Sequence, residues 1–401
     1  MRWRNYLYIL PVVLFIAVFS LWPVIQTFTY TFFDYQQNDP QKSGLYMSDR
    51  FNYELFDETA LYLNMWLKED KNSVTDSELQ GRIDELITKV EGKVADFEGV
   101  EGVQEISSED LDELLAIKAE ADEIINEIAT NYDTPNEENL PLIAADIERS
   151  IVPSNFVGLD GYKEALTDPR LGKSLVNTLV FTIVSVALEL VLGLALALIM
   201  NKAMKGQGLV RTTSLIPWAI PTAVAALMWS YLYDGDSGIV ALIFEKLGLV
   251  EQASDLLLSA EGAMVSAILA DVWKTTPYMA LLLLAGLQTI PKHLYEAAAI
   301  DGASRAYAFF KVTLPLLKPS ILVALLFRTL DAFRVFDLIY VLTGGGPGGA
   351  TETMSIYSYK LMFSQTNFGY GSVVVMIMFV CVAIIAIIYV RFLGTNLMDR
   401  K

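Results

Sequence analysis

A short polar stretch between two long apolar runs organises this chain: Tyr295-Glu296-Ala297-Ala298-Ala299-Ile300-Asp301-Gly302-Ala303-Ser304. Pro291 suits the start of a helix, and the alanine-rich residues after it are good helix formers. Gly302 permits a sharp turn, and Ser304 suits the N-cap of a second short helix that we expect to end near Pro315. Residues 291–315 are therefore predicted to form a compact knob that suits a groove on a soluble partner. An ordinary amphipathic connector would show the same helix pattern.

Five stretches of the sequence resemble one family of transport proteins. The pattern Glu296-Ala297-Ala298, Gly302 and Leu314-Pro315 resembles the cytoplasmic coupling loop of binding-protein-dependent ATP-binding-cassette (ABC) importers. The flanking sequence resembles their maltose-type sugar permeases in four further motifs: Phe156-Val157-Gly158-Leu159-Asp160-Gly161-Tyr162, Asn177-Thr178-Leu179, Pro217-Trp218-Ala219-Ile220-Pro221 and Leu342-Thr343-Gly344-Gly345-Gly346-Pro347. All five follow the family's order, and the resemblance covers roughly residues 156–401 and the first apolar run.

The composition indicates a membrane protein. Of the 401 residues 53% are hydrophobic and the mean hydropathy is +0.40, which is too apolar for an ordinary soluble domain. A helix needs about 20 apolar residues to cross a bilayer. Six runs meet this length: residues 6–33, 175–200, 213–233, 263–290, 320–342 and 372–393. We therefore predict an all-α membrane protein with a first transmembrane helix in residues 1–34 and a five-helix core in residues 153–401.

An acidic segment interrupts the apolar pattern after the first run. The net charge is −18, yet residues 35–172 hold 32 acidic and 11 basic residues while the remainder is slightly basic. Thr75-Asp76-Ser77-Glu78 is a capping box, Ser107-Ser108-Glu109-Asp110 opens a second helix, and apolar residues follow both at helical spacing. Residues 35–152 are predicted to form an extracytoplasmic helical hairpin. A disordered acidic linker is the alternative, and the family usually has a short connection here.

The charges of the connecting segments orient the spans. Basic segments alternate with acidic ones along the chain, and the basic residues are Lys202, Lys205 and Arg211, then Lys292, Arg305, Lys311 and Lys318, then Arg391, Arg400 and Lys401. The positive-inside rule puts these segments and both termini in the cytoplasm. The knob would lie there too, and the acidic insert would lie outside. The resemblance implies the cytoplasmic (inner) membrane of a bacterium.

The sequence lacks the residues that several kinds of functional site require. No Gly-x-x-x-x-Gly-Lys-Ser/Thr loop occurs, and the Gly344–Gly349 stretch lacks the lysine. With a single cysteine, Cys381, and a single histidine, His293, most nucleophile–base pairs are excluded. No basic stripe points to nucleic acid. We expect no enzymatic activity and no bound cofactor, so that ATP and Mg²⁺ would be used by a separate ATPase subunit.

Polar residues inside apolar runs mark a candidate substrate path, because such residues are costly in a bilayer. They are Trp218, Thr222, Asp271, Lys274, Thr275, Asp331 and Arg334. Asp271 with Lys274, and Asp331 with Arg334, are three residues apart and would share a helix face. Each pair would either line the path or only neutralise itself, and Trp218 would alternatively be an interfacial anchor. The resemblance implies a sugar site on these same three helices.

The resemblance implies the permease subunit of a sugar importer that works by alternating access. Its partners would be a second homologous permease, two copies of an ABC ATPase, an extracytoplasmic solute-binding protein and membrane lipid. Three alternatives remain open from the residues. A secondary transporter would couple through ions, although we see no inverted repeat. A glycerophosphate-like anion is a possible substrate, because two cationic side chains lie on the path. A non-transporting scaffold or receptor would be built around the insert.

Overall fold

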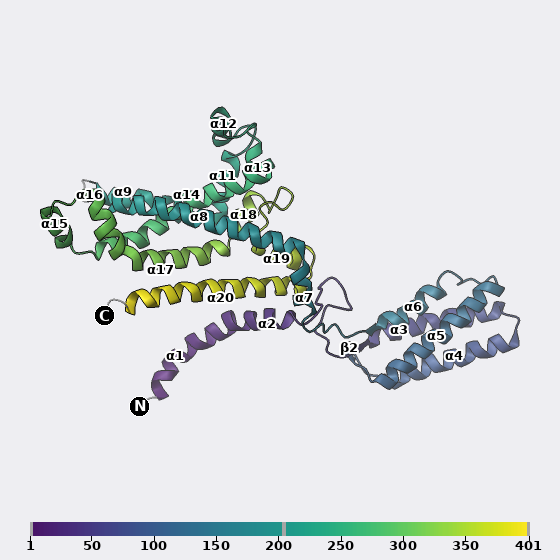
Figure 1. Ribbon diagram of the computed structural model, residues 1–401. Helices are drawn as coiled ribbons and strands as arrows, with labels where there is room; N and C mark the ends of the chain where they lie inside the picture. Colours follow the sequence, from purple (N-terminus) through teal and green to yellow (C-terminus); the bar gives the residue numbers. More distant parts are fainter. Residues whose placement is uncertain (1–2, 203–205, 399–401) are drawn as a thin grey trace. The chain divides into compact units, whose positions relative to one another are not determined.

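The computed structural model describes residues 3–202 and 206–398, and the side chains of residues 8–202 and 206–392. Lys205, Arg400 and Lys401, which were used to orient the chain, lie outside the described residues. The chain divides into two compact units (Figure 1). Unit 1 comprises Met1–Thr31, Asp160–Gln365 and Tyr370–Lys401, and unit 2 comprises Phe32–Leu159 with Thr366–Gly369.

Unit 1 is built from long apolar helices. Helix α1 (Trp3–Ile16) continues through a π-helical stretch (Ala17–Leu21) into α2 (Trp22–Tyr30). The remaining helices are α7 (Asp160–Thr167), α8 (Pro169–Asn201), α9 (Gln207–Ser214), α10 (Ile216–Ala219), α11 (Thr222–Leu232), α12 (Ile239–Lys246), α13 (Asp255–Leu258), α14 (Ala260–Gln288), α15 (Lys292–Ile300), α16 (Arg305–Ala308), α17 (Leu314–Phe333), α18 (Asp337–Leu342), α19 (Met354–Tyr359) and α20 (Phe368–Met398).

The predicted all-α membrane architecture is confirmed. Within the described residues, five helices are long and apolar enough to cross a membrane, or six if one bent pair is a single span. The first of these spans, Tyr8–Tyr30, has no buried residue, so its apolar surface is left for lipid or for a partner chain.

The third span differs from its prediction, because it is a bent pair of helices rather than one helix. Residues 207–219 and 222–232 meet at an angle of 88°, where one helix over residues 213–233 was predicted. Ile220 adopts an extended conformation with ψ 132° because the ring of Pro221 disfavours the helical region for the residue before it. Pro221 also has no N–H to continue the ladder.

The predicted fifth span also begins and ends elsewhere. The second short helix of the knob was expected to end near Pro315, but Arg305–Phe333 forms one long span. A π-helical stretch, Phe309–Thr313, joins α16 to α17, and Pro315 falls in the first turn after it. Pro is tolerated there because a first-turn N–H needs no helical acceptor. The expected end of this span at residue 342 is wrong, because α17 stops at Phe333 and α18 is separate.

Helices α8, α14 and α17 pack against one another to form the core of unit 1. Small residues allow their backbones to approach closely. A Cβ placed on Gly286 of α14 would lie 2.3 Å from the hydroxyl of Ser320 on α17, so only glycine fits at this crossing. The polar residues described below are therefore held on rigid, closely packed helices.

Unit 2 contains four helices, where a hairpin of two was predicted. They are α3 (Tyr53–Asp70), α4 (Ser77–Asp96), α5 (Ser108–Asn131) and α6 (Leu140–Ser150). Neighbouring helices pack in a ring, with α3 against α4 and α6, and α5 against α4 and α6. The two predicted helices are present as α4 and α5, capped by Asp76 and Ser107. The amphipathic patterns of α3 and α6 were missed.

A small antiparallel sheet closes one end of unit 2. Its strands β1 (Arg50–Asn52), β2 (Val103–Glu105) and β3 (Ile151–Val152) lie in the order β2-β1-β3. Phe51, at the centre of β1, is fully buried in the core with Phe56, Leu63 and Ile124. Unit 2 therefore has a hydrophobic core of its own.

Candidate functional site

The predicted substrate-path residues meet at one cavity of unit 1. This cavity has a volume of about 310 Å³, and its walls come from α10, α11, α14, α17, α18 and the residues between α17 and α18. All seven predicted residues line it: Trp218, Thr222, Asp271, Lys274, Thr275, Asp331 and Arg334. Arg328, Val335, Phe336, Asp337 and Leu338 complete the lining. Residues more than 100 positions apart in the chain are thus brought together among the spans.

The lining of the cavity includes a buried arginine, Arg328, that was not among the predicted residues. Arg328 on α17 is 1% exposed and pairs with carboxylates on two other helices. Its Nε and Nη2 donate to the two oxygens of Glu189 on α8 at 2.5 and 2.9 Å. Nη2 also donates to Asp271 on α14, and Nη1 to Asp331 at 3.0 Å. We call Glu189, Asp271, Arg328 and Asp331 the Arg328 network.

The network is unevenly exposed. Glu189 and Asp271 are buried, whereas the side chain of Asp331 is 66% exposed. The Thr275 hydroxyl lies 2.6 Å from Glu189 Oε1 and 2.6 Å from the carbonyl oxygen of Asp271. Buried charges are tolerated only when they are paired and hydrogen-bonded, and the network meets this requirement across α8, α14 and α17. It joins the three core helices at the cavity.

The alternative that Asp271 with Lys274, and Asp331 with Arg334, only neutralise each other is not what the structure shows. Asp271 pairs with Arg328, while Lys274 Nζ lies 3.5 Å from the carbonyl oxygen of Trp218. Asp331 also pairs with Arg328, and Arg334 Nε donates to the carbonyl of Leu330 at 3.0 Å. Arg334 follows the last residue of α17 and has non-helical dihedrals, so helical spacing no longer places it beside Asp331.

A signal for the missed residues was present in the sequence. Glu189 is the one charged residue in the apolar run 175–200, and Arg328 lies inside the run 320–342. The rule that marked Asp271 and Asp331 applies equally to both of them. What the sequence does not show is which acid faces which base across helices.

An aromatic surface lies beside the charged groups. Trp218 on α10 stacks on Tyr278 of α14, with ring centroids 5.6 Å apart and an interplanar angle of 18°. Trp218 remains 45% exposed. The extended Ile220 lies between Trp218 and Thr222, so the two do not lie on one continuous helix, but both line the cavity. A flat apolar face beside hydrogen-bonding groups suits the ring of a sugar.

The predicted coupling loop forms a tightly hydrogen-bonded turn after α15. The amides of Gly302 and Ala303 donate to the carbonyls of Ala299 and Ala298 at 3.1 and 2.9 Å, which is a Schellman motif. Gly302 has φ +78°, a conformation that favours glycine. Ser304 then caps α16 by accepting from the amide of Tyr307 at 3.2 Å.

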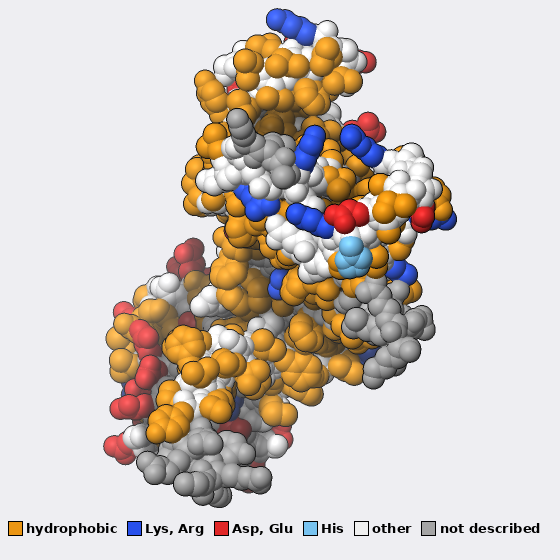
Figure 2. Space-filling model, turned by 90° about the vertical axis from the view of Figure 1, so that its left-hand side faces the viewer, with side chains coloured by type: hydrophobic (Ala, Val, Ile, Leu, Met, Phe, Trp, Pro, Cys, Tyr) orange, Lys and Arg blue, Asp and Glu red, His pale blue; other side chains and the backbone are white. Residues whose placement is uncertain are grey.

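The coupling-loop residues present an outward surface. Helix α15 has no buried residue, and Glu296, Ala297 and Pro315 are exposed, whereas Ala298 and Leu314 are half-buried. A hydrogen bond of 3.0 Å between the hydroxyls of Tyr295 and Thr313 fixes α15 to the start of the long span. Figure 2 shows Lys and Arg side chains gathered around the single histidine, His293, at this end of unit 1.

The glycine-rich stretch forms a turn fixed to α8. Asn177 Nδ2 donates to the carbonyls of Gly349 and Glu352, both at 3.0 Å. Glu352 is 4% exposed and pairs with Arg170 at 2.7 Å and Lys360 at 2.8 Å. Burial opposes ionisation of Glu352, but these hydrogen bonds outweigh it and hold the pKa of its carboxyl below the usual value. The glycine-rich stretch is thus held against α8 by hydrogen bonds.

Comparisons with known proteins agree with this architecture. The family described as "Binding-protein-dependent transport system inner membrane component" matches residues 189–397. The trehalose/maltose transport system permease protein MalF of Thermococcus litoralis is 47% identical over 59% of this chain and 79% of its own length. The trehalose transport system permease protein SugA of Mycobacterium tuberculosis is 46% identical over 60% of this chain and 75% of its own length.

One further relative and one solved structure are also similar to this chain. The sulfoquinovosyl glycerol transport system permease protein SmoG of Agrobacterium fabrum is 39% identical over 61% of this chain and 79% of its own length. A solved bacterial ABC transporter that imports the acidic polysaccharide alginate has the same fold, with a TM-score of 0.54 and 22% identity over 60% of this chain and 84% of that chain. The resemblance noted in the coupling loop is confirmed, and the chain belongs to the family of inner-membrane components of binding-protein-dependent transport systems.

Proposed function

We propose that this chain is the permease subunit of an ATP-driven importer for an uncharged disaccharide or short oligosaccharide. The observation that carries the proposal is the cavity of about 310 Å³, where the stacked Trp218 lies beside hydrogen-bonding groups from several helices. Its volume is near the lower end of the range for ligand sites. The trehalose and maltose cargo named for the relatives at 47% and 46% identity supports the same substrate class.

The charges of the cavity favour an uncharged ligand. Arg328 is already engaged by three carboxylates, so it offers little positive charge to a substrate. Lys274 and Arg334 remain, but Asp331 and Asp337 lie on the same walls. With Glu189 behind the wall, acids outnumber bases by one, and an anion would gain no net attraction.

An anionic sugar is the second candidate, and two observations favour it. Lys274 and Arg334 line the cavity without a carboxylate ion pair within the described residues. The relative SmoG has the sulfonated sugar sulfoquinovosyl glycerol in its name.

Uptake of labelled sugars into proteoliposomes that hold the complete importer separates the two candidates. We expect ATP-dependent accumulation of trehalose or maltose, and a marked loss with Trp218→Ala. The exposed Trp22 on α2 gives a matched control, and Trp22→Ala should transport normally. Uptake of sulfoquinovosyl glycerol in preference to both neutral sugars would contradict the assignment.

The partners complete the proposed mechanism. A second homologous permease and two copies of an ABC ATPase would join this chain, and an extracytoplasmic solute-binding protein would deliver the sugar. ATP and Mg²⁺ would be bound by the ATPase, whose closure would move the loop formed by Glu296, Ala297, Ala298, Gly302, Leu314 and Pro315. Nucleotide and the loaded binding protein would shift the population between inward- and outward-open states.

The basic end that carries α15 supports a cytoplasmic position for the coupling loop and both termini. The insert would then face outward from the cytoplasmic membrane. Accessibility of single cysteines in intact cells tests this orientation. A cysteine at Tyr307 should be protected from an impermeant thiol reagent and one at Leu115 should be labelled, and the reverse pattern would overturn it.

A further inference from the structure

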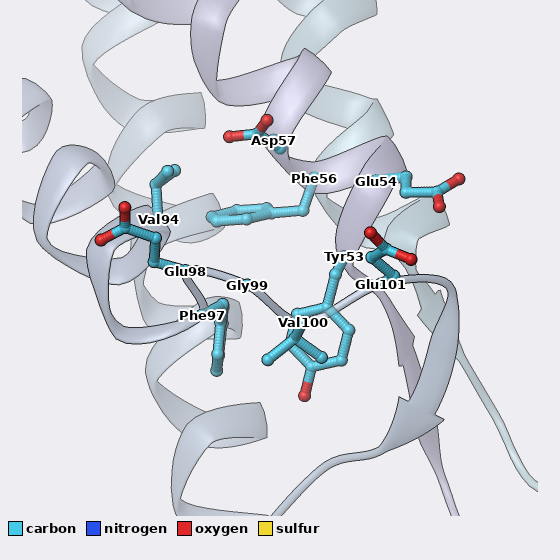
Figure 3. A pocket seen from close by; sticks show the side chains of 10 residues that line it. All are labelled: Tyr53, Glu54, Phe56, Asp57, Val94, Phe97, Glu98, Gly99, Val100 and Glu101. Atoms are coloured by element: carbon cyan, nitrogen blue, oxygen red, sulfur yellow. The ribbon is translucent and has the colours of Figure 1, made fainter.

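Two hollows meet along one face of α3 on the surface of unit 2. The larger has a volume of about 460 Å³, and its lining includes Leu61, Asn64 and Lys68. The smaller has a volume of about 400 Å³, lies at the start of α3 and shares Asp57 and Val94 with the larger one (Figure 3). We call the two hollows together the α3–α4 groove. Each hollow has the volume of a small-molecule site.

The acids of the smaller hollow have no cationic partner in this chain. Elsewhere in unit 2 the acids of α5 pair with bases of α4, as Glu123 does with Arg82. By contrast, the acids that line the smaller hollow form no ion pair with any residue that the structure describes: Glu54, Asp57, Glu98 and Glu101. A hollow lined by charges of one sign attracts counter-ions from solution.

These carboxylates are spread around an aromatic ring. In Figure 3, Glu98 lies on one side of the Phe56 ring and Asp57 lies above it. Glu54 and Glu101 lie on the other side of the ring. Within residues 8–202 and 206–392, no three His, Cys, Asp or Glu side chains converge so that they could hold one metal ion. A ligand that matches this arrangement carries several cationic groups with an apolar chain between them.

Aromatic and apolar side chains lie between the acids of the groove. The ring centroids of Tyr53 and Phe97 are 4.8 Å apart in the smaller hollow. Leu61 and Met65 continue the apolar wall in the larger hollow, and both are exposed. Aromatic faces attract cationic groups, and apolar walls favour the burial of methylene groups.

A buried acceptor further along α3 lacks a donor. Asn64 is 8% exposed and lines the larger hollow, yet its Oδ1 accepts no hydrogen bond from the described residues. Nearly all buried polar atoms in folded proteins are hydrogen-bonded, because an unmet acceptor is costly. Asn64 follows Asp57 by about 10 Å along the helix axis, and both line the larger hollow. A ligand that extends from the acids and carries a further N–H group would satisfy Asn64.

The lining favours a ligand that donates hydrogen bonds and accepts few. Among the described residues that line the groove, Lys68 is the one cationic side chain, and it pairs with Glu91 at 3.0 Å. A peptide brings a carbonyl acceptor for almost every N–H donor, and those carbonyls would face carboxylates. A linear polyamine consists only of cationic donors and methylene groups, so it matches both the acids and the apolar walls.

We propose that the α3–α4 groove binds a linear aliphatic polyamine with three or more amino groups. One ammonium group lies near Glu54 and Glu101. A second lies near Asp57 and Glu98, and the methylene groups lie against the apolar walls. A third donates a hydrogen bond to Asn64 Oδ1. The site is separate from the sugar cavity, and the inference does not depend on the proposed function.

Equilibrium dialysis of radiolabelled spermidine, a triamine, against the full chain in nanodiscs tests the proposal. The lipid is phosphatidylcholine, which has no net charge, and nucleotide is omitted because its phosphates bind polyamines. We expect saturable binding, with spermidine bound at least about tenfold more tightly than the diamine putrescine, because only the triamine reaches Asn64.

Variants of the groove separate its two parts. Asp57→Asn with Glu98→Gln keeps the shape of the groove and should weaken spermidine binding at least about tenfold, because the acids that hold one ammonium group are lost. Asn64→Leu should remove the advantage of spermidine over putrescine. The control, Asp133→Asn with Glu138→Gln, changes two exposed acids outside the groove and should bind like wild type.

Hydrogen exchange of the buried α4 amides checks that unit 2 stays folded, and if Asn64→Leu unfolds it, the double variant decides. Unchanged spermidine affinity in the folded double variant Asp57→Asn with Glu98→Gln would overturn the site. Displacement of spermidine by Mg²⁺ more effectively than by Na⁺ at equal ionic strength would overturn it in favour of a metal site. Tighter binding of a lysine peptide of equal charge, lost in the same double variant, would overturn it in favour of a protein partner. Failure of the proposed function looks different, because it would abolish sugar uptake and leave spermidine binding intact.

Discussion

Arg328 shows how this protein holds a cation inside an apolar bundle. Its guanidinium engages both oxygens of Glu189, a geometry that a planar fork provides and a lysine does not. Of the carboxylates that pair with Arg328, those of Glu189 and Asp271 are buried, whereas that of Asp331 is exposed at the cavity. The residue therefore contributes both to the packing of the helices and to the wall of the cavity.

Removing Arg328 should be more damaging than removing its exposed partner. Arg328→Gln leaves Glu189 and Asp271 as buried carboxylates without a cation, a loss of about 3–5 kcal/mol of stability. Asp331→Asn should cost far less, because the side chain of Asp331 is 66% exposed. Thermal unfolding in detergent, followed by size-exclusion chromatography, measures both. Arg328→Lys should recover little, and equal stability of Arg328→Gln and Asp331→Asn would contradict the assignment.

At the scale of single residues, the sequence predicted the members of the site better than their partners. All seven predicted path residues line the cavity, since polar groups in apolar runs are costly enough to be recognisable. The pairing of Asp271 and Asp331 with Arg328 depends on how α14 and α17 pack, and one sequence carries no signal for that.

The coupling loop is an element whose shape depends on one backbone conformation. A Cβ at Gly302 would meet no atom of the described residues within 4 Å, so within this chain a substitution there acts through its φ of +78°. The Schellman motif formed by Gly302 and Ala303 ends α15 and starts the turn to α16.

The effect of a substitution at Gly302 should depend on how well the new residue tolerates a positive φ. Gly302→Val should cost about 1–2 kcal/mol in the turn and uncouple transport from hydrolysis, whereas Gly302→Asn should be milder because Asn tolerates this conformation. ATPase co-purification and uptake are measured together. Gly172→Val on α8, where φ is not positive, is the control for β-branching. Normal uptake by well-expressed Gly302→Val would show that the loop does not couple.

Helices α4 and α5 are joined by a buried lysine. The Lys93 side chain is 6% exposed and bonds to Asp110 at 2.7 Å and to Glu113. Burial opposes its charge, but these bonds outweigh it and raise the pKa of Lys93. The bonds from Lys93 and Ser107 in turn lower the pKa of Asp110.

The stability of this helix pair should therefore depend on pH. Because the pKa of Asp110 is lowered in the folded state, its contribution is present above the ordinary carboxyl pKa and is lost as the pH falls through the lowered value. Lys93→Met should speed hydrogen exchange in α4 and α5 at neutral pH and differ less from wild type in acid. Lys89→Met, at a more exposed pair, should have a smaller effect. If hydrogen exchange in Lys93→Met differed from that in wild type by the same factor at both pH values, the result would argue against the ion pair.

The elements of unit 2 were predicted in part. Helices α4 and α5 have strong caps and regular apolar stripes, so their existence followed from local sequence. The apolar spacing of Phe56, Ala60, Leu63 and Leu67 marks α3 equally well, and its cap is Asn52. The three short strands pair across long sequence separations, such as Arg50 with Val152, and no local pattern reveals them.

At the scale of the whole molecule, two parts of unit 1 would carry two separate tasks. The cavity of unit 1 would hold the sugar, and the α15 turn would respond to the ATPase. Both parts fall within the region shared with the family, whereas the insert lies outside the matched residues 189–397. We therefore expect that properties in which this chain differs from its relatives arise mainly from the insert.

Protection of a cysteine in the cavity tests the central claim most directly. Cys381 is the chain's only cysteine, so Cys381→Ser provides a background in which Thr222→Cys is labelled alone by a methanethiosulfonate reagent. The complete importer is supplied with binding protein and a non-hydrolysable ATP analogue, and the labelling rate is measured with and without sugar. We predict that trehalose or maltose slows labelling of Thr222→Cys and leaves Tyr307→Cys on α16 unchanged. An unchanged rate at Thr222→Cys, in an importer that transports the sugar, would contradict the assignment of this cavity.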